Sequence, residues 1–286
     1  MRTVTTRAEL EAALAAHERP RALVPTMGAL HAGHAALIST ARRHAATVVV
    51  SLFVNPLQFG SATDLARYPR TLDADARLAE ASGADVLFAP AVEEMYPPTE
   101  VIPTINPGPL AVRLEGASRP GHFAGVATVV SRLFDLVHPD LALFGEKDAQ
   151  QVRVVEWLAA QRSDQIRIMR VATVRDRDGL ALSSRNQRLS QHGRKSAART
   201  IPVALSLVAE AYASGVRSVG TLRALAERVI ASEPSVELDY LDFANGDSLA
   251  PLPDSTELHD TGADPILVSL AAVVDSVRLI DAITIP

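Results

Sequence analysis

The chain has 286 residues, a formal net charge of -5 and no cysteine. This length exceeds the usual single-domain size of roughly 100–200 residues, so we expect one large domain or two unequal ones. The negative charge argues against a general affinity for nucleic acid or an anionic membrane surface. The lack of cysteine excludes disulfides and thiolate chemistry and leaves oxygen or imidazole ligands for any metal.

The sequence predicts a soluble, cytoplasmic protein. Met1–Thr6 opens a polar, alanine-rich helix candidate without the apolar segment of a signal peptide. Apolar runs elsewhere, such as residues 48–50 and 271–274, are far shorter than the roughly 18 residues that a membrane helix needs. We therefore expect no membrane association.

Strands and helices alternate through the first part of the chain. Apolar runs predict strands at residues 22–24, 47–54, 86–88, 141–144 and 166–172. Helical spacing predicts helices after residue 34, over about 73–82, over 126–137 and through 152–159. Residues 60–64 look like a mobile loop, and the proline- and glycine-rich residues 90–120 look irregular with short extended pieces.

This alternation predicts an α/β fold, a Rossmann-like, doubly wound parallel sheet whose ligand site lies at the carboxyl ends of the strands. Two long helical patterns and three strand candidates, at residues 236–243, 266–274 and 277–283, follow. We expect a boundary near Thr173–Val174. It would separate a nucleotide-binding domain, residues 1–173, from a smaller α/β lid domain, residues 174–286, with helices and a small antiparallel sheet.

The most informative stretch is Pro25–His34, Pro-Thr-Met-Gly-Ala-Leu-His-Ala-Gly-His. It stands between a predicted strand and a predicted helix, where backbone N–H groups and a helix dipole can receive phosphate. Gly28 and Gly33 allow close approach of a ligand. His31 and His34 could bind phosphate, cap the turn or bind a metal, although the i,i+3 spacing differs from the i,i+4 spacing of a zinc-protease helix.

Two further polar groups follow predicted strands. Asn55 and Gln58 offer neutral amides suited to a hydroxylated or carboxylated small molecule, or they form an ordinary polar strand end. In residues 145–151, Lys147 offers a point charge for phosphate and Gln151 can face the same pocket. A solvated turn is the alternative for this second group.

Two more groups carry cations. Ser183, Ser184 and Arg185 form a compact anion clamp at the expected domain junction, or they are part of a plain loop. Their position would let the second domain close over a nucleotide held by the first. Arg119 and His122 precede the clearest helix of the first half, so they could neutralise a substrate or cap that helix.

Taken together and in this order, the motifs from Pro25 to Asn186 resemble the pantoate–β-alanine ligases, which are also called pantothenate synthetases. The family belongs to the nucleotidyltransferases that share the His-x-Gly-His motif. Residues 277–281 are similar too. The resemblance implies that pantoate attacks the α-phosphate of ATP to give pantoyl adenylate and pyrophosphate, after which β-alanine attacks the acyl carbon and releases AMP. Such a reaction needs a preorganised cationic cradle and no covalent nucleophile.

The resemblance also implies residue roles. The implied ATP-binding residues are Met27, Gly28, Ala29, Leu30, His31, Ala32, Gly33, His34, Gly145, Glu146, Lys147, Asp148, Val174, Leu182, Ser183, Ser184 and Arg185. The implied catalytic residues are His34, assigned as proton donor, with His31, Lys147 and Arg185. The implied pantoate and β-alanine residues are Gln58, Gln151, Asn55, Arg119 and His122.

Tyr68 and the loop before it would form a gate that keeps water from the adenylate. The resemblance further implies Mg²⁺ accompanying ATP, with ligands that are mostly phosphate oxygens and water, and a homodimer. Three positions depart from the family pattern, namely Ala32, Ala149 and Leu182, where glutamate, an aromatic residue and methionine are common. We expect these departures to alter affinity at most.

Two other functions compete with this one. A related nucleotidyltransferase acting on a phosphorylated substrate would want cations where the chain has Gln58 and Gln151. A catalytically idle nucleotide sensor would keep the fold but need not keep His34, Lys147 and Arg185 together. Gly-x-Gly-x-x-Gly and Walker A motifs, which mark other nucleotide-binding classes, are missing from the sequence.

Overall fold

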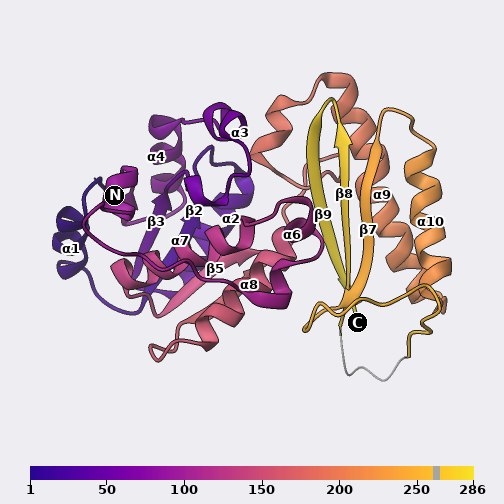
Figure 1. The fold of residues 1–286 in the computed structure, drawn as a ribbon. Helices are drawn as coiled ribbons and strands as arrows, with labels where there is room; N and C mark the ends of the chain where they lie inside the picture. Colours follow the sequence, from indigo (N-terminus) through magenta and orange to yellow (C-terminus); the bar gives the residue numbers. More distant parts are fainter. Residues whose placement is uncertain (260–264) are drawn as a thin grey trace. The chain divides into compact units, whose positions relative to one another are not determined.

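A computed structural model describes residues 1–259 and 265–286 of the chain (Figure 1). These residues form two compact units, each with its own hydrophobic core. Unit 1 comprises Met1–Gly145 and Gln151–Val171. Unit 2 comprises Glu146–Gln150 and Ala172–Pro286. A five-residue segment after the fifth strand thus clusters with the unit that is mainly formed by the C-terminal part of the chain.

Unit 1 is built on a six-stranded parallel sheet in the order β1-β4-β3-β2-β5-β6, which confirms the predicted Rossmann-like fold. The chain moves outward from β2 to β3 and β4 and then returns to place β5 on the other side of β2. Ligands of such sheets bind where the strand order reverses, at the carboxyl ends of the strands. That point lies here between β2 and β5. The strands are β1 (Arg2–Val4), β2 (Arg21–Thr26), β3 (Thr47–Leu52), β4 (Val86–Phe88), β5 (Leu141–Gly145) and β6 (Arg167–Val171).

Helices cover both faces of this sheet (Figure 1), and the strands are accordingly apolar on both sides. Leu23 of β2 and Val49 of β3 pack in one core with α1 and α7, whereas their neighbours Val24 and Val50 pack in the other with α2. The elements are α1 (Arg7–Ala15), α2 (Ala32–His44), η1 (Pro56–Gln58), α3 (Ala62–Arg67), α4 (Leu72–Ala81), α5 (Val92–Met95), η2 (Gly108–Ala111), α6 (Glu115–Ser118), α7 (His122–Val137) and α8 (Ala149–Ala160).

Three local predictions for unit 1 are wrong. The expected loop at residues 60–64 leads into helix α3, because the Ser61 side chain caps it and accepts a hydrogen bond from Thr63 N at 3.2 Å. Residues 90–120 contain the short helical pieces α5, η2 and α6 rather than extended ones. Residues 2–4 form strand β1 instead of opening a helix, because they pair with β4, more than eighty residues away in the sequence.

Unit 2 contains two long helices and a three-stranded antiparallel sheet, as predicted. In Figure 1, α9 and α10 lie side by side along this sheet, and both contribute to its core. The strands and helices are η3 (Glu146–Asp148), η4 (Ser184–Arg188), α9 (Gln191–Ala213), α10 (Val219–Ala231), β7 (Glu237–Asn245), β8 (Ile266–Val274) and β9 (Val277–Ile285). Asp281 of β9 is buried and accepts two hydrogen bonds from the Arg175 guanidinium, at 2.6 and 3.0 Å.

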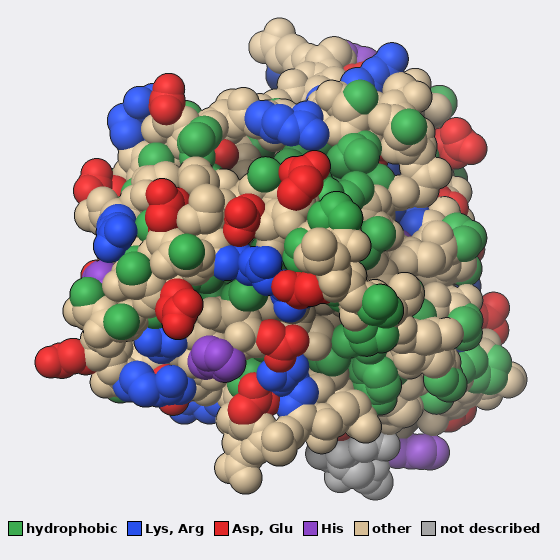
Figure 2. Space-filling model, turned by 60° about the vertical axis from the view of Figure 1, so that its left-hand side comes forward, with side chains coloured by type: hydrophobic (Ala, Val, Ile, Leu, Met, Phe, Trp, Pro, Cys, Tyr) green, Lys and Arg blue, Asp and Glu red, His purple; other side chains and the backbone are tan. Residues whose placement is uncertain are grey.

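The surface carries charges of both signs. On the face drawn in Figure 2, Lys and Arg side chains lie among Asp and Glu side chains. Paired examples from unit 1 are Arg162 with Asp135 at 2.8 Å and Arg19 with Asp140 at 2.7 Å. Within the described ranges, none of the helices is both long enough and apolar enough to cross a membrane.

Candidate active site

The turn after β2 is held by its own two histidines. His31 is the N-cap of α2, and its Nδ1 accepts a hydrogen bond from Gly33 N at 3.2 Å. His34, three residues later, reaches back, and its Nδ1 accepts a hydrogen bond from His31 N at 3.2 Å. This is the reciprocal arrangement of a capping box, with imidazoles in the place of the usual hydroxyl and carboxylate. The sequence motif is therefore the start of a helix. The N–H groups of His31 and Gly33 both find side-chain acceptors within the motif.

These bonds decide which ring nitrogen carries the proton. A backbone N–H can only donate, so Nδ1 of His31 and Nδ1 of His34 both act as acceptors. In the neutral rings the proton then sits on Nε2, at the other edge of each imidazole. The two ring centroids are 4.1 Å apart, so two imidazoles with Nε2–H donors lie side by side at the start of α2. Such donors suit the oxygens of a phosphate.

The same turn needs unusual backbone angles. Gly28 has φ +88° and Ala29 has φ +50°, both in the left-handed region. Asp75 of α4, which is buried, stabilises this conformation by accepting hydrogen bonds from Ala29 N at 3.0 Å and Leu30 N at 2.7 Å. A Cβ at Gly28 would meet Asp75 Oδ2 at 3.1 Å. The sequence does not predict this role for Asp75, because the residue resembles any other acidic residue of a surface helix.

A metal ion at the histidine pair would have to bind through Nε2. Nδ1 of each ring is occupied by an N–H donor. The described residues contain no group of three or more His, Asp or Glu side chains that could hold a metal ion, and the chain has no cysteine.

The segment after β3 places two amides at the same edge of the sheet. Asn55 is 1% exposed, and all its polar capacity is used. Its Nδ2 donates to Gly125 O and to Gln58 Oε1, both at 3.0 Å. Its Oδ1 accepts from Leu57 N at 3.2 Å and from the Tyr96 hydroxyl at 2.9 Å. Asn55 therefore acts within the protein by orienting its neighbours.

Gln58 is held from both ends. Its main-chain carbonyl accepts a hydrogen bond from Nδ1 of His122 at 2.9 Å and one from Arg119 Nη2 at 3.3 Å. Arg119 Nη1 lies 3.3 Å from Nε2 of His122, so the three groups form one cluster. The side-chain Nε2 of Gln58 points to the sulfur of Met27 at 3.2 Å, which places this amide against the turn after β2. The structure thus brings Asn55, Gln58, Arg119 and His122 together, with Met27 beside them.

Tyr68 and Gln151 complete the predicted residues of unit 1. Tyr68 is the C-cap of α3 and packs edge-on against Phe59, with ring centroids 5.7 Å apart. Gln151 lies in the first turn of α8 and is half-buried. Gly145 is the last residue of β5, which is the strand hydrogen-bonded to β2. Gly145 therefore lies at the carboxyl edge where the strand order reverses.

The remaining predicted residues belong to unit 2. Glu146, Lys147 and Asp148 form the short helix η3, in which Lys147 Nζ lies 3.4 Å from Asp148 Oδ1. Lys147 is mostly buried, with a side chain that is 15% exposed.

Val174 and the Ser-Ser-Arg segment are brought together within this unit. Leu182 N donates to Val174 O at 2.9 Å, and Asp176 N donates to Leu180 O at 2.9 Å, so residues 174–182 fold back on themselves. The side chain of Ser183 caps η4 and accepts a hydrogen bond from Arg185 N at 3.3 Å. Ser184 stands between them in the first turn of η4.

Comparison with known proteins identifies the family of this arrangement. A family model described as pantoate-beta-alanine ligase matches residues 2–284. The chain is 48% identical over 281 residues to a pantothenate synthetase of Chloroflexus aurantiacus, covering 98% of this chain and 97% of that protein. It is 47% identical over 290 residues to one of Corynebacterium glutamicum, covering 99% of each.

Solved structures support the same family. A pantothenate synthetase of Thermus thermophilus is 44% identical and superposes with a TM-score of 0.89, covering 99% of both chains. The pantoate-beta-alanine ligase of Francisella tularensis, crystallised with beta-gamma ATP and beta-alanine, is 29% identical with a TM-score of 0.78, covering 99% of this chain and 97% of that one. The chain belongs to the pantoate-beta-alanine ligase family.

Proposed function

We propose that the carboxyl edge of the unit 1 sheet activates pantoate on ATP for its ligation to β-alanine, with the turn after β2 serving ATP and the segment after β3 serving pantoate. As a member of the pantoate-beta-alanine ligase family, the chain joins pantoate and β-alanine at the expense of ATP and releases AMP and pyrophosphate. The observation that carries the division of roles is the histidine pair that caps α2, in a turn whose Met27 sulfur accepts a hydrogen bond from the Gln58 amide.

In the first step a pantoate carboxylate oxygen forms a bond to the α-phosphorus of ATP, and the bond from that phosphorus to the bridging oxygen of pyrophosphate breaks. Negative charge moves onto the leaving pyrophosphate. Nε2–H of His34, with His31 beside it, donates hydrogen bonds to phosphate oxygens as this charge develops, and preorganised donors of this kind are effective catalysts. Met27–Gly33 would line the nucleotide, with no side chain acting as a covalent nucleophile.

In the second step the amine of β-alanine attacks the acyl carbon of pantoyl adenylate, and the bond from that carbon to the phosphate oxygen of AMP breaks. Gln58 and Gln151 would hold pantoate through both steps, with Gln58 near β-alanine. Arg119 and His122 support Gln58 through its carbonyl, so their contribution to substrate binding would be indirect in part. Asn55 would act in the same indirect way, since its own amide is saturated.

The family resemblance implies further ATP contacts from residues 145–148 and 174–185. Lys147 offers a point charge and Arg185 a planar guanidinium, both suited to phosphate oxygens. The hydroxyls of Ser183 and Ser184 and the backbone of Gly145–Asp148, Val174 and Leu182 would add neutral contacts. Residues 1–173 would form the nucleotide- and pantoate-binding domain and residues 174–286 the lid. Tyr68 would close the site against water, which would otherwise hydrolyse the adenylate.

Mg²⁺ is expected to arrive with ATP. The described residues contain no group of three or more His, Asp or Glu side chains that could hold a metal ion. On the family resemblance, the ligands of Mg²⁺ would be mostly phosphate oxygens and water. On the family resemblance, we also propose that the protein is a homodimer and that it is cytoplasmic.

A pyrophosphate-release assay tests the proposal. ATP is incubated with pantoate alone and with pantoate plus β-alanine, and pyrophosphate and AMP are both measured. We expect pyrophosphate to form with pantoate alone, up to one equivalent per site, and AMP to be released continuously only when β-alanine is added. Absence of pantoate-dependent pyrophosphate would instead support an idle nucleotide sensor. Activity with a phosphorylated substrate in place of pantoate would support the related nucleotidyltransferase.

A further inference from the structure

The orientation of the Gln58 amide is decided through Asn55, whose own orientation is set by backbone groups on both sides of it. Asn55 has one backbone donor, Leu57 N, on one side and one backbone acceptor, Gly125 O, on the other. Its oxygen must therefore face Leu57 and its nitrogen must face Gly125. The second N–H of Asn55 then requires an acceptor, and Oε1 of Gln58 fills that position at 3.0 Å. Gln58 is left to present its NH₂ group, the end that lies against Met27.

The last hydrogen-bonding position of Asn55 belongs to Tyr96. Oδ1 of Asn55 already accepts from Leu57 N, and the Tyr96 hydroxyl donates to it at 2.9 Å. Burial raises the pKa of Tyr96, which keeps the phenol protonated and therefore a donor. Its ring packs edge-on against Phe53 with centroids 5.9 Å apart, so the hydroxyl has little freedom to turn away. Tyr96, Asn55 and Gln58 thus form one hydrogen-bond chain running in a single direction.

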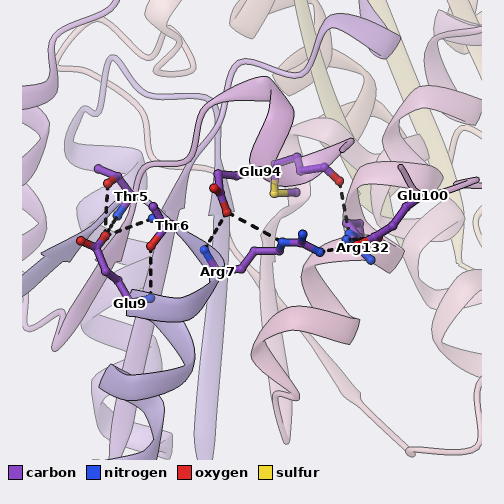
Figure 3. Close-up of polar contacts among 8 residues, drawn as sticks. Thr5, Thr6, Arg7, Glu9, Glu94, Glu100 and Arg132 are labelled. Atoms are coloured by element: carbon purple, nitrogen blue, oxygen red, sulfur yellow. Dashed lines mark hydrogen bonds and ion pairs between the residues drawn. The ribbon is translucent and has the colours of Figure 1, made fainter. Parts of the chain in front are cut away.

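An ion-pair network holds the segment that carries Tyr96 (Figure 3). Glu94, two residues before it, accepts a hydrogen bond from Arg7 N at 2.8 Å. Glu100, four residues after it, pairs with Arg7 and with Arg132, each at 2.5 Å. Arg132 Nε also donates to the carbonyl of Met95 at 3.2 Å, directly next to Tyr96. Helices α1 and α7 are therefore both tied to the short segment between residues 94 and 100.

We propose that Tyr96 is a positioning residue for pantoate, acting through Asn55 to hold the Gln58 amide with its NH₂ group toward the substrate. An NH₂ donor fits the carboxylate and hydroxyl oxygens of pantoate, whereas the opposite orientation would set an amide oxygen against a carboxylate. The inference rests on the proposed role of Gln58 in binding pantoate. It adds a residue from a segment for which the sequence predicts only irregular structure.

Steady-state kinetics of four variants test the inference: Tyr96→Phe, Gln58→Ala, the double variant, and Tyr212→Phe as matched control. Tyr96→Phe keeps the ring on Phe53 and removes only the hydroxyl. We expect the KM for pantoate to rise about fivefold, the scale of one neutral hydrogen bond, with an unchanged KM for ATP. Added to Gln58→Ala, Tyr96→Phe should cause no further loss, because its effect passes through the missing amide.

Tyr212→Phe removes a comparable buried hydroxyl, which donates to Pro286 O at 2.6 Å in unit 2. It should lower the melting temperature without changing the KM for pantoate. An equal rise in that KM for the control, additive losses in the double variant, or an unchanged KM in Tyr96→Phe would each overturn the positioning role. If Gln58→Ala raises the KM and Tyr96→Phe does not, only this inference fails. If Gln58→Ala itself leaves the KM unchanged, the proposed pantoate role of Gln58 fails as well.

A second variant keeps the test independent of Tyr96. Asn55→Asp has nearly the same shape but replaces the Nδ2 donor by an oxygen, which would face Gly125 O and Gln58 Oε1. We expect a larger rise in the KM for pantoate than with Tyr96→Phe. A wild-type KM in a folded Asn55→Asp protein would overturn the relay.

Discussion

The turn after β2 and the segment after β3 lie at the same edge of one sheet, yet they are stabilised in different ways. In the turn, His31 and His34 bond to backbone N–H groups within three residues of themselves. In the segment, Gln58 depends on Tyr96, Arg119 and His122, which are 38 to 64 residues distant along the chain (96 − 58 and 122 − 58). The histidine cap is therefore local, although Asp75 of α4 also holds the turn through Ala29 N and Leu30 N. The orientation of Gln58 is a tertiary construction.

This difference explains what each region can do. A locally capped turn presents the same donors whenever the helix forms, which suits the invariant phosphates of ATP. A side chain held by distant partners can be oriented for one substrate, which suits the recognition of pantoate. Damage to the turn should therefore reduce the chemical step or ATP binding, whereas damage to the segment should mainly raise the KM for pantoate.

The largest effect is expected for His34→Ala. This change removes the proposed donor to the phosphates and the Nδ1 acceptor of His31 N. Pantoate-dependent exchange of pyrophosphate into ATP should fall on the order of 100–1000-fold. Near-normal exchange in a folded variant would contradict the assigned role.

A smaller effect is expected for Asp75→Ala, which leaves His31 and His34 in place but removes the acceptor of Ala29 N and Leu30 N. The strained turn should lose its fixed shape, so the KM for ATP should rise on the order of tenfold, since each bond is charge-assisted. Initial-rate kinetics with ATP varied at saturating pantoate measure this. A rise confined to the KM for pantoate would show that the two regions are not separate.

Gly125→Ala tests the segment after β3 by a steric route. A Cβ there would lie 2.4 Å from Leu57 O and 2.7 Å from Gln58 N, so α7 and η1 would have to move apart. We expect a loss of about 1–3 kcal/mol in the free energy of unfolding and a severalfold higher KM for pantoate. Chemical denaturation and initial rates check both. Substitution at Gly60, where a Cβ meets nothing within 4 Å, is the matched control for folding.

The smallest effect concerns the ion pairs that hold the segment of Tyr96. The hydrogen bond from Arg7 lowers the pKa of Glu100 below its ordinary 4.5, and Arg132 contributes further. A lowered folded-state pKa means that the stabilisation is present above pH 4.5 and is lost as the pH falls through the folded value. Glu100→Gln should thus be slightly less stable than wild type at about pH 7, and the difference should shrink at about pH 3.5. A difference that grows on acidification would contradict this.

The same contrast separates what is predictable from the sequence from what is not. The parallel sheet, the helix ending before Pro139 and the turn at Pro25–His34 depend on short-range patterns, and the sequence predicts all three. Strand β1 and the roles of Asp75 and Tyr96 depend on contacts between distant parts of the chain. No local pattern distinguishes Asp75 from the other acids of α4, or Tyr96 from a surface tyrosine in a proline-rich segment. The sequence predicts that Asn55 belongs to the site. Only the structure shows that all hydrogen-bonding positions of its amide are already used within the protein.

The separation of ATP and pantoate roles is tested most directly by pyrophosphate–ATP exchange with His34→Ala and Gln58→Ala side by side, each over a full range of both substrates. We expect His34→Ala to remain slow at saturating ATP and pantoate. Gln58→Ala should approach the wild-type exchange rate at saturating pantoate, with a raised KM for pantoate and an unchanged KM for ATP. Recovery of His34→Ala at high pantoate, together with a Gln58→Ala defect that pantoate does not relieve, would contradict the account.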